Sequence, residues 1–298
     1  MKHILSIDLE EWYQLAHRRL TGQLLPPRDS IHRQMDRLLQ LLEAGRTKAT
    51  FFVLGLTADD FPDLVKHVAG LGHEIACHGH SHRVLQRMTR EEFREDTHRG
   101  KARLEDLVGE PVLGYRAPEF SLRSDTLWAL EVLAELGFAY DSSIFPIRHR
   151  RYGIPAFSRQ PACYYLPNGA VITEIPLATI RWGRGNLPVA GGGYFRLLPL
   201  RVIRAAVRQL EAESLPMVTY VHPYEFDSEP LDIFHVLQHS GWTGKLNGVR
   251  FNWMQNLGRS SMAAKLTALV TEFQFTACRE FLAQTDLQHR RSLLVGTN

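Results

Sequence analysis

The sequence alternates short apolar runs, rich in β-branched and aromatic residues, with segments whose apolar residues recur every three or four positions. The first pattern predicts buried strands and the second predicts helices. An alternation of this kind predicts an α/β protein with a parallel sheet, either closed as a (β/α) barrel or open and covered on both faces. We expect strands at 3–8, 49–55, 73–77, 112–116, 138–143, 171–176, 217–223 and 272–275, and helices at 31–42, 61–71, 93–107, 126–136, 198–210 and 262–270.

Two segments fit the alternation poorly. Residues 144–170 and 223–258 are rich in Pro, Gly, His and aromatic residues, and we expect them to form long functional loops or lids. Neither a Gly/Ser-rich nor a highly charged linker divides the sequence. We therefore expect a single domain over residues 1–298, with residues 230–298 packed on it as a C-terminal extension.

Composition narrows the class of partner and the compartment. Lys and Arg number 35 against 32 Asp and Glu, a formal net charge of +3 without a dense basic run, which argues against nucleic acid as the partner. The cysteines Cys77, Cys163 and Cys278 are odd in number and widely spaced, which favours a reducing compartment. No run approaches the ~18 apolar residues of a membrane span, and the first residues lack a signal-peptide pattern. We expect a cytoplasmic location and no membrane span.

Polar side chains stand at the C-terminal ends of several predicted strands. Parallel α/β folds gather their active-site residues at this end of the sheet, so these side chains are expected to meet in one site. Any one of them alone would be better interpreted as a helix cap or a turn residue. They are Asp8, His78, Arg116, Asp141 and His222.

Three histidines follow the strand at 73–77 within five residues. If this segment forms a helical turn, His78 and His82 face the same side and can bind one divalent cation, whereas His80 points elsewhere. The alternative is that one histidine caps the following helix and another lies on the surface.

The acidic residues needed beside such a pair follow the first strand. In extended backbone Asp8 and Glu10 share a face and Glu11 opposes them, so one carboxylate can bind the metal while another acts as a base. Two imidazoles and a carboxylate leave coordination positions for water and a substrate oxygen, and they favour Zn²⁺ over Mg²⁺. The alternative is that these acids are a solvated end to the strand.

Five motifs resemble, in the same order, those of the polysaccharide deacetylase family, the NodB-like group of carbohydrate esterase family 4. They are SIDLEEW, HGHSH within HEIACHGHSHR, YRAPEFS, YDSSIFP and TYVHPYEFD. RYGIP, NLPVAGGGYFRLLP and RFNWMQNLGR resemble stretches of the subgroup encoded with exosortase-linked exopolysaccharide loci. The resemblance implies a metal-dependent amide hydrolase on a distorted (β/α) barrel of about seven parallel strands.

The resemblance also implies a role for each matching residue. Asp8 would be the general base, His222 the general acid, Arg116 a residue that orients the active-site acids, and Asp141 the acid that holds His222. The metal ligands would be His78 and His82, and the backbone N–H of Glu119 would stabilise the oxyanion.

The sequence departs from the family pattern in two places. The first motif commonly has two adjacent aspartates, but Leu9 occupies the second position, so the carboxylate ligand is expected to shift to Glu10. The third motif usually has an aromatic residue after the proline, where this chain has Glu119 and then Phe120. The second change alters the floor of the expected substrate site.

Residues outside the motifs are candidates for holding the substrate. Tyr194, Phe195 and Arg196 follow three glycines and could hold a sugar ring and an anionic group, and Trp12 could stack on a sugar face. The alternative is an ordinary glycine turn before a helix and an aromatic residue of the core. The basic segment 148–151 is either a solvated turn or a site for a phosphate-bearing carrier.

The leading hypothesis is a metal-dependent hydrolase that removes N-acetyl groups from the amino sugars of an exopolysaccharide or its precursor, free or linked to a lipid or nucleotide. One alternative is a hydrolase of another C–N bond, such as a cyclic amide or ureide, on the same scaffold. Another is a non-catalytic carbohydrate-binding protein. Asp8, Arg116, Asp141 and His222 together argue against the last, because sugar binding needs no set of proton-transfer groups.

Overall fold

The computed structural model describes residues 1–22, 24–183, 185–189, 191–227, 229–231, 242–287 and 290–293. Within them, seven strands lie side by side in the order β10-β1-β2-β3-β4-β5-β7, and every neighbouring pair in this run is parallel. This confirms the predicted α/β class with its parallel sheet. The strands are β1 (Lys2–Leu9), β2 (Thr50–Val53), β3 (Glu74–Cys77), β4 (Gly114–Tyr115), β5 (Tyr140–Asp141), β7 (Val171–Glu174) and β10 (Val218–Val221).

The two ends of this run approach each other, which gives the sheet the form of a distorted barrel. Beyond β7 the chain continues to Ala178, whose N–H donates to the carbonyl of Val218 in β10 at 3.1 Å. Gly191 forms an isolated parallel bridge with Tyr220 in the same strand. Among the described residues β7 and β10 are not paired as strands, so irregular backbone completes the barrel here.

Further strands extend the sheet or stand beside it. Strand β6 pairs antiparallel with β7, β12 pairs with β6, β11 pairs with β1, and β8 and β9 form a separate hairpin. Strand β6 lies inside the segment 144–170 that was predicted to be a loop, and that prediction is wrong at this point. The bounds are β6 (Ala162–Tyr165), β8 (Thr179–Trp182), β9 (Gly185–Pro188), β11 (Gln274–Thr276) and β12 (Arg290–Ser292).

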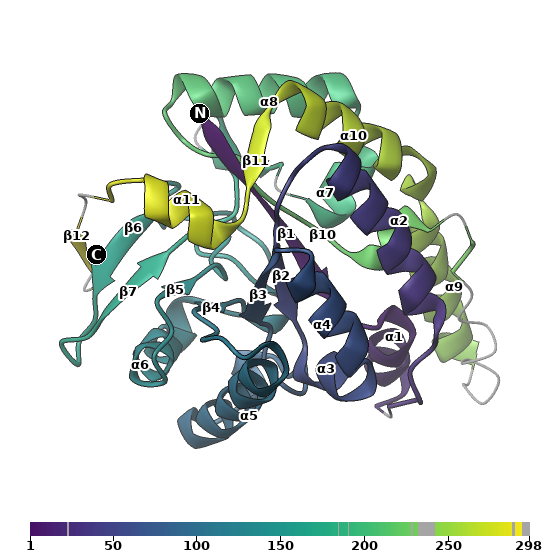
Figure 1. Cartoon of the computed structure of the whole chain (residues 1–298), viewed down its shortest axis with the longest axis horizontal. Coiled ribbons are helices and arrows are strands. Elements are labelled where there is room, and N and C mark those ends of the chain that lie inside the picture. Colours follow the sequence, from purple (N-terminus) through teal and green to yellow (C-terminus); the bar gives the residue numbers. More distant parts are fainter. Residues whose placement is uncertain are drawn as a thin grey trace.

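Helices surround the strands, as Figure 1 shows for α2, α4, α5, α6, α8 and α10. Helix α9 occupies much of the segment 223–258, so the prediction of a long loop there is also wrong. The helices are α1 (Trp12–Thr21), α2 (Ser30–Ala44), α3 (Gly55–Asp60), α4 (Pro62–Gly70), α5 (Arg90–Val108), α6 (Trp128–Glu135), α7 (Gly192–Leu197), α8 (Leu200–Ala212), α9 (Trp242–Asn256), α10 (Met262–Glu272) and α11 (Cys278–Gln284). Short 3₁₀ turns are η1 (Leu85–Arg87), η2 (Pro118–Phe120), η3 (Ser124–Thr126), η4 (Pro223–Phe226) and η6 (Arg259–Ser261).

Helix α11 lies across the N-terminal ends of the parallel strands, in front of them in Figure 1. The N–H of Cys278 donates to Oγ1 of Thr50 at 2.7 Å, and the N–H of Arg279 donates to the carboxylate of Glu74 at 2.8 Å. Thr50 and Glu74 are the first residues of β2 and β3. The C-terminal ends of the strands, where the candidate residues stand, are at the other end of the barrel.

One apolar cluster runs through most of the described chain. It includes Ile4 of β1 and Leu38 of α2, and also Met262 of α10 and Phe281 of α11, from the predicted C-terminal extension. Residues 232–241, 288–289 and 294–298 of that extension lie outside the described residues, and the single-domain organisation stays a prediction. Within the described residues no helix combines the length and apolar character needed to cross a bilayer.

Candidate metal and catalytic site

The C-terminal ends of four parallel strands bring together the side chains that carry the chemistry. Asp8 and Glu10 stand at the end of β1, His78 follows β3, Arg116 follows β4 and His222 follows β10. All five are connected through contacts of 4.0 Å or less. Four of the five residues predicted to meet at this end of the sheet are thus connected in the structure, with Glu10 among them, and the fifth, Asp141, has other partners.

Glu10, His78 and His82 form a group that can hold a metal ion. One ligand atom from each lies within 4.8 Å of the others. Oε2 of Glu10 is 2.9 Å from Nε2 of His82 and 3.6 Å from Nε2 of His78. Burial raises the pKa of Glu10, but the charge and the ring nitrogens of His82 and His78 outweigh it and hold the pKa well below its usual range. Glu10 is therefore a carboxylate at neutral pH.

The donor atoms of this group fit a divalent metal. Nδ1 of His78 lies 2.8 Å from the carbonyl of Arg116, so Nδ1 carries a proton, and Nε2, on the side of Glu10, is the ring nitrogen that can bind a metal. Oε2 of Glu10 is buried and has no aligned hydrogen-bond partner, although two ring nitrogens lie close to it. Two imidazole nitrogens and a buried carboxylate oxygen without a hydrogen bond are a donor set that suits Zn²⁺.

The segment with the histidines is a loop, so the expected helical turn is wrong. His82 has a φ of 52°, a left-handed backbone conformation that is uncommon for residues other than glycine. Asp96 of α5 holds the loop by accepting from the N–H groups of His80, at 2.9 Å, and Ser81, at 3.2 Å. Arg18 of α1 donates to the carbonyls of Ser81 and His82. The side chains of Asp96 and Arg18 thus fix the direction in which the loop presents His82.

Asp8 pairs with Arg116 and not with the histidines of the metal group. Its Oδ1 accepts from Nη1 of Arg116 at 2.8 Å, and both side chains are buried. The guanidinium also donates to Oγ of Ser6 and to the carbonyl and Oγ of Ser142, and it packs over the ring of Phe52 at 4.0 Å. Arg116 is thus held from several sides with its guanidinium against the carboxylate of Asp8, a geometry compatible with the predicted orienting role.

His222 faces the two carboxylates from β10. Its Nε2 lies 3.6 Å from Oε1 of Glu10 and 4.0 Å from Oδ2 of Asp8. On the other side of the ring, Nδ1 lies 3.4 Å from Oε2 of Glu225. Burial lowers the pKa of His222, but Glu225, Glu10 and Asp8 outweigh it and raise the pKa to about 9. The ring is therefore protonated at neutral pH.

Glu225, and not Asp141, is the carboxylate beside Nδ1 of His222. Asp141 accepts instead from Oγ of Ser143 at 2.6 Å and from the N–H of Ser143 at 3.1 Å. Burial raises the pKa of Asp141, and both burial and the charge of Asp141 raise the pKa of the neighbouring Glu174. The predicted Asp141–His222 pair is wrong because Asp141, on β5, turns toward β7.

The backbone around Glu119 suits the predicted oxyanion donor. Glu119 and Phe120 have φ values of 53° and 52°, and strained backbone of this kind is concentrated at functional sites. Among the described residues, the N–H of Glu119 donates no hydrogen bond. The Glu119 side chain points to Arg151, whose Nη1 is 3.3 Å away. Whether this N–H meets a substrate oxygen stays a prediction.

Three of the four predicted substrate-binding residues are used elsewhere in the structure. Trp12 is 5% exposed and stacks on Phe251, and Phe195 is fully buried in the core. Arg196 is 7% exposed and forms an ion pair with Glu225. These three predictions are wrong. The glycine-rich segment leads into α7, which directs Phe195 and Arg196 inward, and α1 packs Trp12 against Phe251. Tyr194 is half-buried, with its ring 6.4 Å from that of Phe145, and it remains a candidate.

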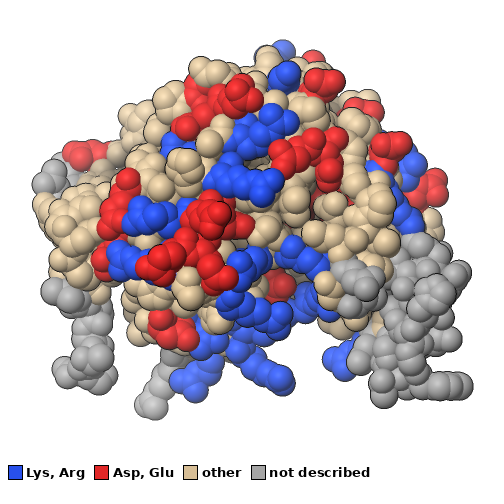
Figure 2. Space-filling model, turned by 90° about the horizontal axis from the view of Figure 1, so that it is seen from below, with Lys and Arg blue, Asp and Glu red and all other residues tan. Residues whose placement is uncertain are grey.

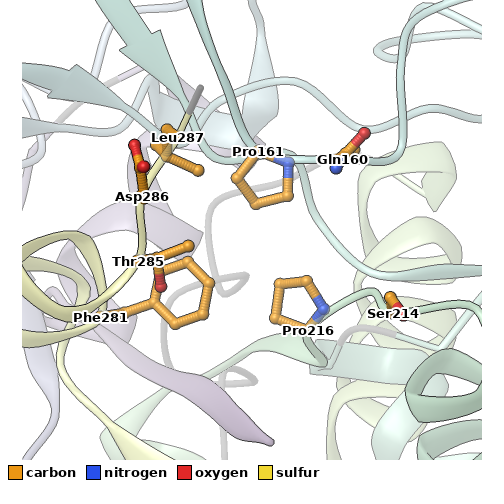
Figure 3. Close-up of a pocket in the computed structure, with 8 residues that line it drawn as sticks. All are labelled: Gln160, Pro161, Ser214, Pro216, Phe281, Thr285, Asp286 and Leu287. Atoms are coloured by element: carbon orange, nitrogen blue, oxygen red, sulfur yellow. The ribbon is translucent and has the colours of Figure 1, made fainter. Parts of the chain in front are cut away.

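Two pockets of the surface lie apart from this group of residues. Figure 3 shows a pocket of about 180 Å³ in which Pro161 and Phe281 face Pro216, and no candidate site residue lines it. A larger groove of about 720 Å³ runs between the segment 146–160 and the hairpin β8–β9, and its lining includes Arg148, Arg159 and Arg181. The chemistry of the side chains, and not cavity size, therefore locates the site.

Two functional contacts were missed by the sequence analysis. Glu225 stands three residues after His222, and its Oε2 accepts from the N–H of His222 at 2.9 Å, the reciprocal arrangement of a capping box. That spacing is visible in the motif TYVHPYEFD. Asp96 lies in the middle of α5, and no local signal in the sequence marks it as a partner of the histidine loop.

Two family models match this chain, each over a different part of it. A model described as polysaccharide deacetylase matches residues 28–140, and a model described as a domain of unknown function, DUF3473, matches residues 142–283. The first match excludes Asp8 and Glu10, and the second includes His222 and Glu225.

Curated relatives cover parts of the chain. A peptidoglycan-N-acetylglucosamine deacetylase of Bacillus cereus is 34% identical over 32% of this chain and 35% of its own length. A peptidoglycan deacetylase of Helicobacter pylori is 32% identical over 37% of this chain and 36% of its own length. A peptidoglycan deacetylase-like protein of Gibberella zeae is 25% identical over 75% of this chain and 58% of its own length. The chain thus spans about a third of the first two relatives and somewhat more than half of the third.

Two solved structures share the fold over nearly the whole chain. A polysaccharide deacetylase of Mycobacterium smegmatis, whose assignment is putative in its own description, has a TM-score of 0.59 at 20% identity and covers 100% of this chain and 96% of its own. A probable polysaccharide deacetylase of Pseudomonas aeruginosa PAO1 has a TM-score of 0.57 at 15% identity and covers 95% of this chain and 90% of its own. These likenesses confirm the predicted fold.

Proposed function

Because this chain belongs to the polysaccharide deacetylase family, we propose that it is a metal-dependent hydrolase of the N-acetyl groups of amino sugars. We further propose that these sugars belong to an exopolysaccharide or its precursor. The observation that carries the proposal is the group Glu10, His78 and His82, set beside the oriented carboxylate of Asp8 and the protonated ring of His222. A metal site, a base and an acid in contact can together hydrolyse an amide.

Glu10, His78 and His82 would hold the metal, for which we propose Zn²⁺. When bound, such an ion polarises the acyl carbonyl and lowers the pKa of water. Asp8 then accepts the proton of the attacking water, and Arg116 keeps its carboxylate in place. The backbone N–H of Glu119 donates to the oxygen that gains negative charge.

His222 completes the reaction as the acid. An amine leaves only after it gains a proton, and an imidazolium held between carboxylates has one to give. The pKa of about 9 keeps the ring protonated at neutral pH, and Nε2 faces the same space as Asp8 and Glu10. A binding protein without catalysis needs neither feature, so this pair of observations favours an enzyme.

The form of the substrate is also a proposal. Arg148 and Arg150 are exposed on the loop that follows the motif YDSSIFP, and Arg148 lines the larger groove. Figure 2 shows Lys and Arg side chains gathered along the lower edge of the face that it presents. Exposed guanidinium groups bind phosphate well. They support an anionic substrate, such as an amino sugar linked to a lipid phosphate or a nucleotide. The cytoplasmic location expected from the three cysteines stays a proposal.

Acetate release from a panel of substrates tests the proposed function. The panel contains N-acetylated amino-sugar oligomers, phosphorylated N-acetylated amino sugars, a cyclic amide and a ureide, each assayed with added Zn²⁺. We expect release of acetate from N-acetylated sugars alone. The cyclic amide and the ureide release no acetate, so their hydrolysis is followed by loss of the substrate, and it would favour the alternative hydrolase. Binding of sugars without any hydrolysis would favour the carbohydrate-binding protein.

A further inference from the structure

A buried ion pair stands directly behind His222. Glu225 is fully buried, and its Oε1 lies 3.1 Å from Nε of Arg196, which is 7% exposed. The contact is an ion pair without the alignment of a hydrogen bond. The other carboxylate oxygen, Oε2, accepts from the N–H of His222 and lies beside Nδ1 of its ring. Glu225 therefore connects Arg196 to both the backbone and the ring of His222.

The C-terminal segment holds this pair in place. Arg196 donates to the carbonyl of Gln255 at the end of α9. Nζ of Lys265, on α10, donates to the carbonyls of Phe195 at 3.0 Å and Arg196 at 2.7 Å. The side chain of Gln255 also accepts from the hydroxyl of Tyr224 at 2.8 Å. The segments on both sides of the ion pair are thus fixed to α9 and α10.

Arg259, which lies in η6 between α9 and α10, adds a second connection between these helices and η4. Its guanidinium donates to the carbonyls of Tyr224 and Asp227, each at 2.9 Å, which flank Glu225 along the chain. A role in stability alone does not require this chemistry, because a buried ion pair adds little to stability compared with well-packed apolar residues. Through Glu225 the pair contacts the Nδ1 edge of the His222 ring, opposite the Nε2 edge that faces Asp8 and Glu10.

We propose that Glu225 and Arg196 are positioning residues, fixed by the C-terminal segment, that keep Nε2 of His222 directed at the leaving nitrogen of the substrate. The inference rests on the proposed function. It gives the part of the chain matched by the DUF3473 model a task in the reaction. Neither residue touches the substrate, and both act through His222.

The test compares two leaving groups in the same full-length protein. Amine departure from an N-acetylated amino-sugar oligomer needs a proton, whereas the phenolate of 4-nitrophenyl acetate leaves without one. We expect Glu225→Gln to lower kcat for the sugar about 100-fold and kcat for the aryl ester less than about 3-fold. Arg196→Met should act in the same direction, and Arg196→Lys should recover part of the loss. Arg204→Gln breaks a surface ion pair with Glu272 and should change neither rate.

Metal content and thermal unfolding of each variant show whether it is loaded and folded. If one variant does not fold, the other decides the outcome. An equal loss for both substrates in folded, metal-loaded variants would overturn the positioning role and leave the proposed function intact. If the wild-type protein released no acetate from any N-acetylated sugar, the proposed function would fall, and this inference with it.

Discussion

Two carboxylates at the end of β1 have different partners and therefore different tasks. Asp8 is fixed by Arg116 at 2.8 Å, and Glu10 lies 2.9 Å from Nε2 of His82. A carboxylate that already accepts from a guanidinium is well oriented to take a proton from water. A buried carboxylate beside two ring nitrogens suits a metal.

Substitution of each carboxylate by its amide should separate these tasks. Asp8→Asn should lower kcat about 10²- to 10⁴-fold with metal content unchanged, because a base is lost without a ligand. Glu10→Gln should lower the affinity for Zn²⁺ first. Elemental analysis and kcat at saturating Zn²⁺ measure the two effects, and the reverse pattern would exchange the two roles.

His73 contributes a pH dependence to stability that is separate from the site. It is 4% exposed, its Nδ1 accepts from the N–H of Ala49 at 3.2 Å, and burial together with Lys48 lowers its pKa to about 4. In the folded protein His73 therefore stays neutral at pH values at which the unfolded chain is already protonated, because the ordinary pKa of this group is 6.5. The stabilising contribution is present above pH 6.5 and is lost as the pH falls toward 4.

Removal of this titration should flatten the acid side of the stability profile. Titration of His73 should lower the free energy of unfolding of the wild type by about 2 kcal/mol between pH 7 and pH 5. His73→Asn keeps a hydrogen-bond acceptor and should not show this loss. Urea unfolding of both metal-free proteins at the two pH values gives the comparison. Identical losses in the two proteins would show that His73 is not responsible.

The sequence located most single residues of the site but not their pairing. Asp8, His78 and His222 were predictable because each follows an apolar strand, and residues at that position meet in a parallel sheet. The partner of His222 was missed although Glu225 stands only three residues after it, because the family resemblance favoured Asp141, which in the structure binds Ser143 instead. Arg196 was predicted to bind substrate because an exposed and a buried arginine look the same in sequence.

At the scale of elements, two helices determine the shape of the histidine loop. Asp96 of α5 accepts from the N–H groups of His80 and Ser81, and Arg18 of α1 donates to the carbonyls of Ser81 and His82. The loop is neither helix nor strand, so these side chains supply hydrogen bonds that a regular element would form within itself. The left-handed backbone at His82 depends on them.

Loss of the α5 contact should weaken metal binding. Asp96→Ala removes the acceptor for two N–H groups, and we expect the Kd for Zn²⁺ to rise about 10- to 100-fold, as is typical for residues that orient metal ligands. At saturating Zn²⁺, kcat should change little. Glu95→Ala, an exposed neighbour on the same helix, is the matched control. An unchanged Kd in Asp96→Ala would show that the loop holds its own shape.

Elements with a regular period or a continuous buried apolar run were predicted, and elements with neither signal were missed. Helix α2 buries a regular series of residues, such as Ile31, Leu38 and Leu42, which makes its period visible. Strands β6, β8 and β9 each have four residues and partly exposed faces, too short for an alternation to stand out. Helix α9 has apolar and polar residues distributed around it without a clear face, so its sequence resembles a loop.

At the scale of the whole molecule, the two ends of the barrel are different. Helix α11 covers the N-terminal ends of the strands, and the chemistry lies at the C-terminal ends. Arg148 and Arg150 are exposed on a loop that leaves the C-terminal end of β5, and within the described residues neither forms an ion pair. Their charge is therefore free to attract an anionic substrate.

A double substitution of these arginines should affect anionic substrates selectively. Arg148→Ala with Arg150→Ala should raise KM about 3- to 10-fold for a phosphorylated N-acetylated sugar at low salt, and less at high salt because exposed charges are screened. KM for a neutral N-acetylated oligomer should not change. Lys66→Ala, on the exposed surface of α4, controls for a general loss of charge. Equal effects on both substrates would exclude a role in charge recognition.

The central claim, metal-dependent deacetylation at the ends of the strands, is tested most directly by acetate release during Zn²⁺ titration of chelator-treated protein. With an N-acetylated amino-sugar substrate, wild type should regain activity up to one Zn²⁺ per chain. Folded His78→Ala with His82→Ala should regain none. Acetate release that is undiminished after chelation, or equal in the double variant, would contradict the account.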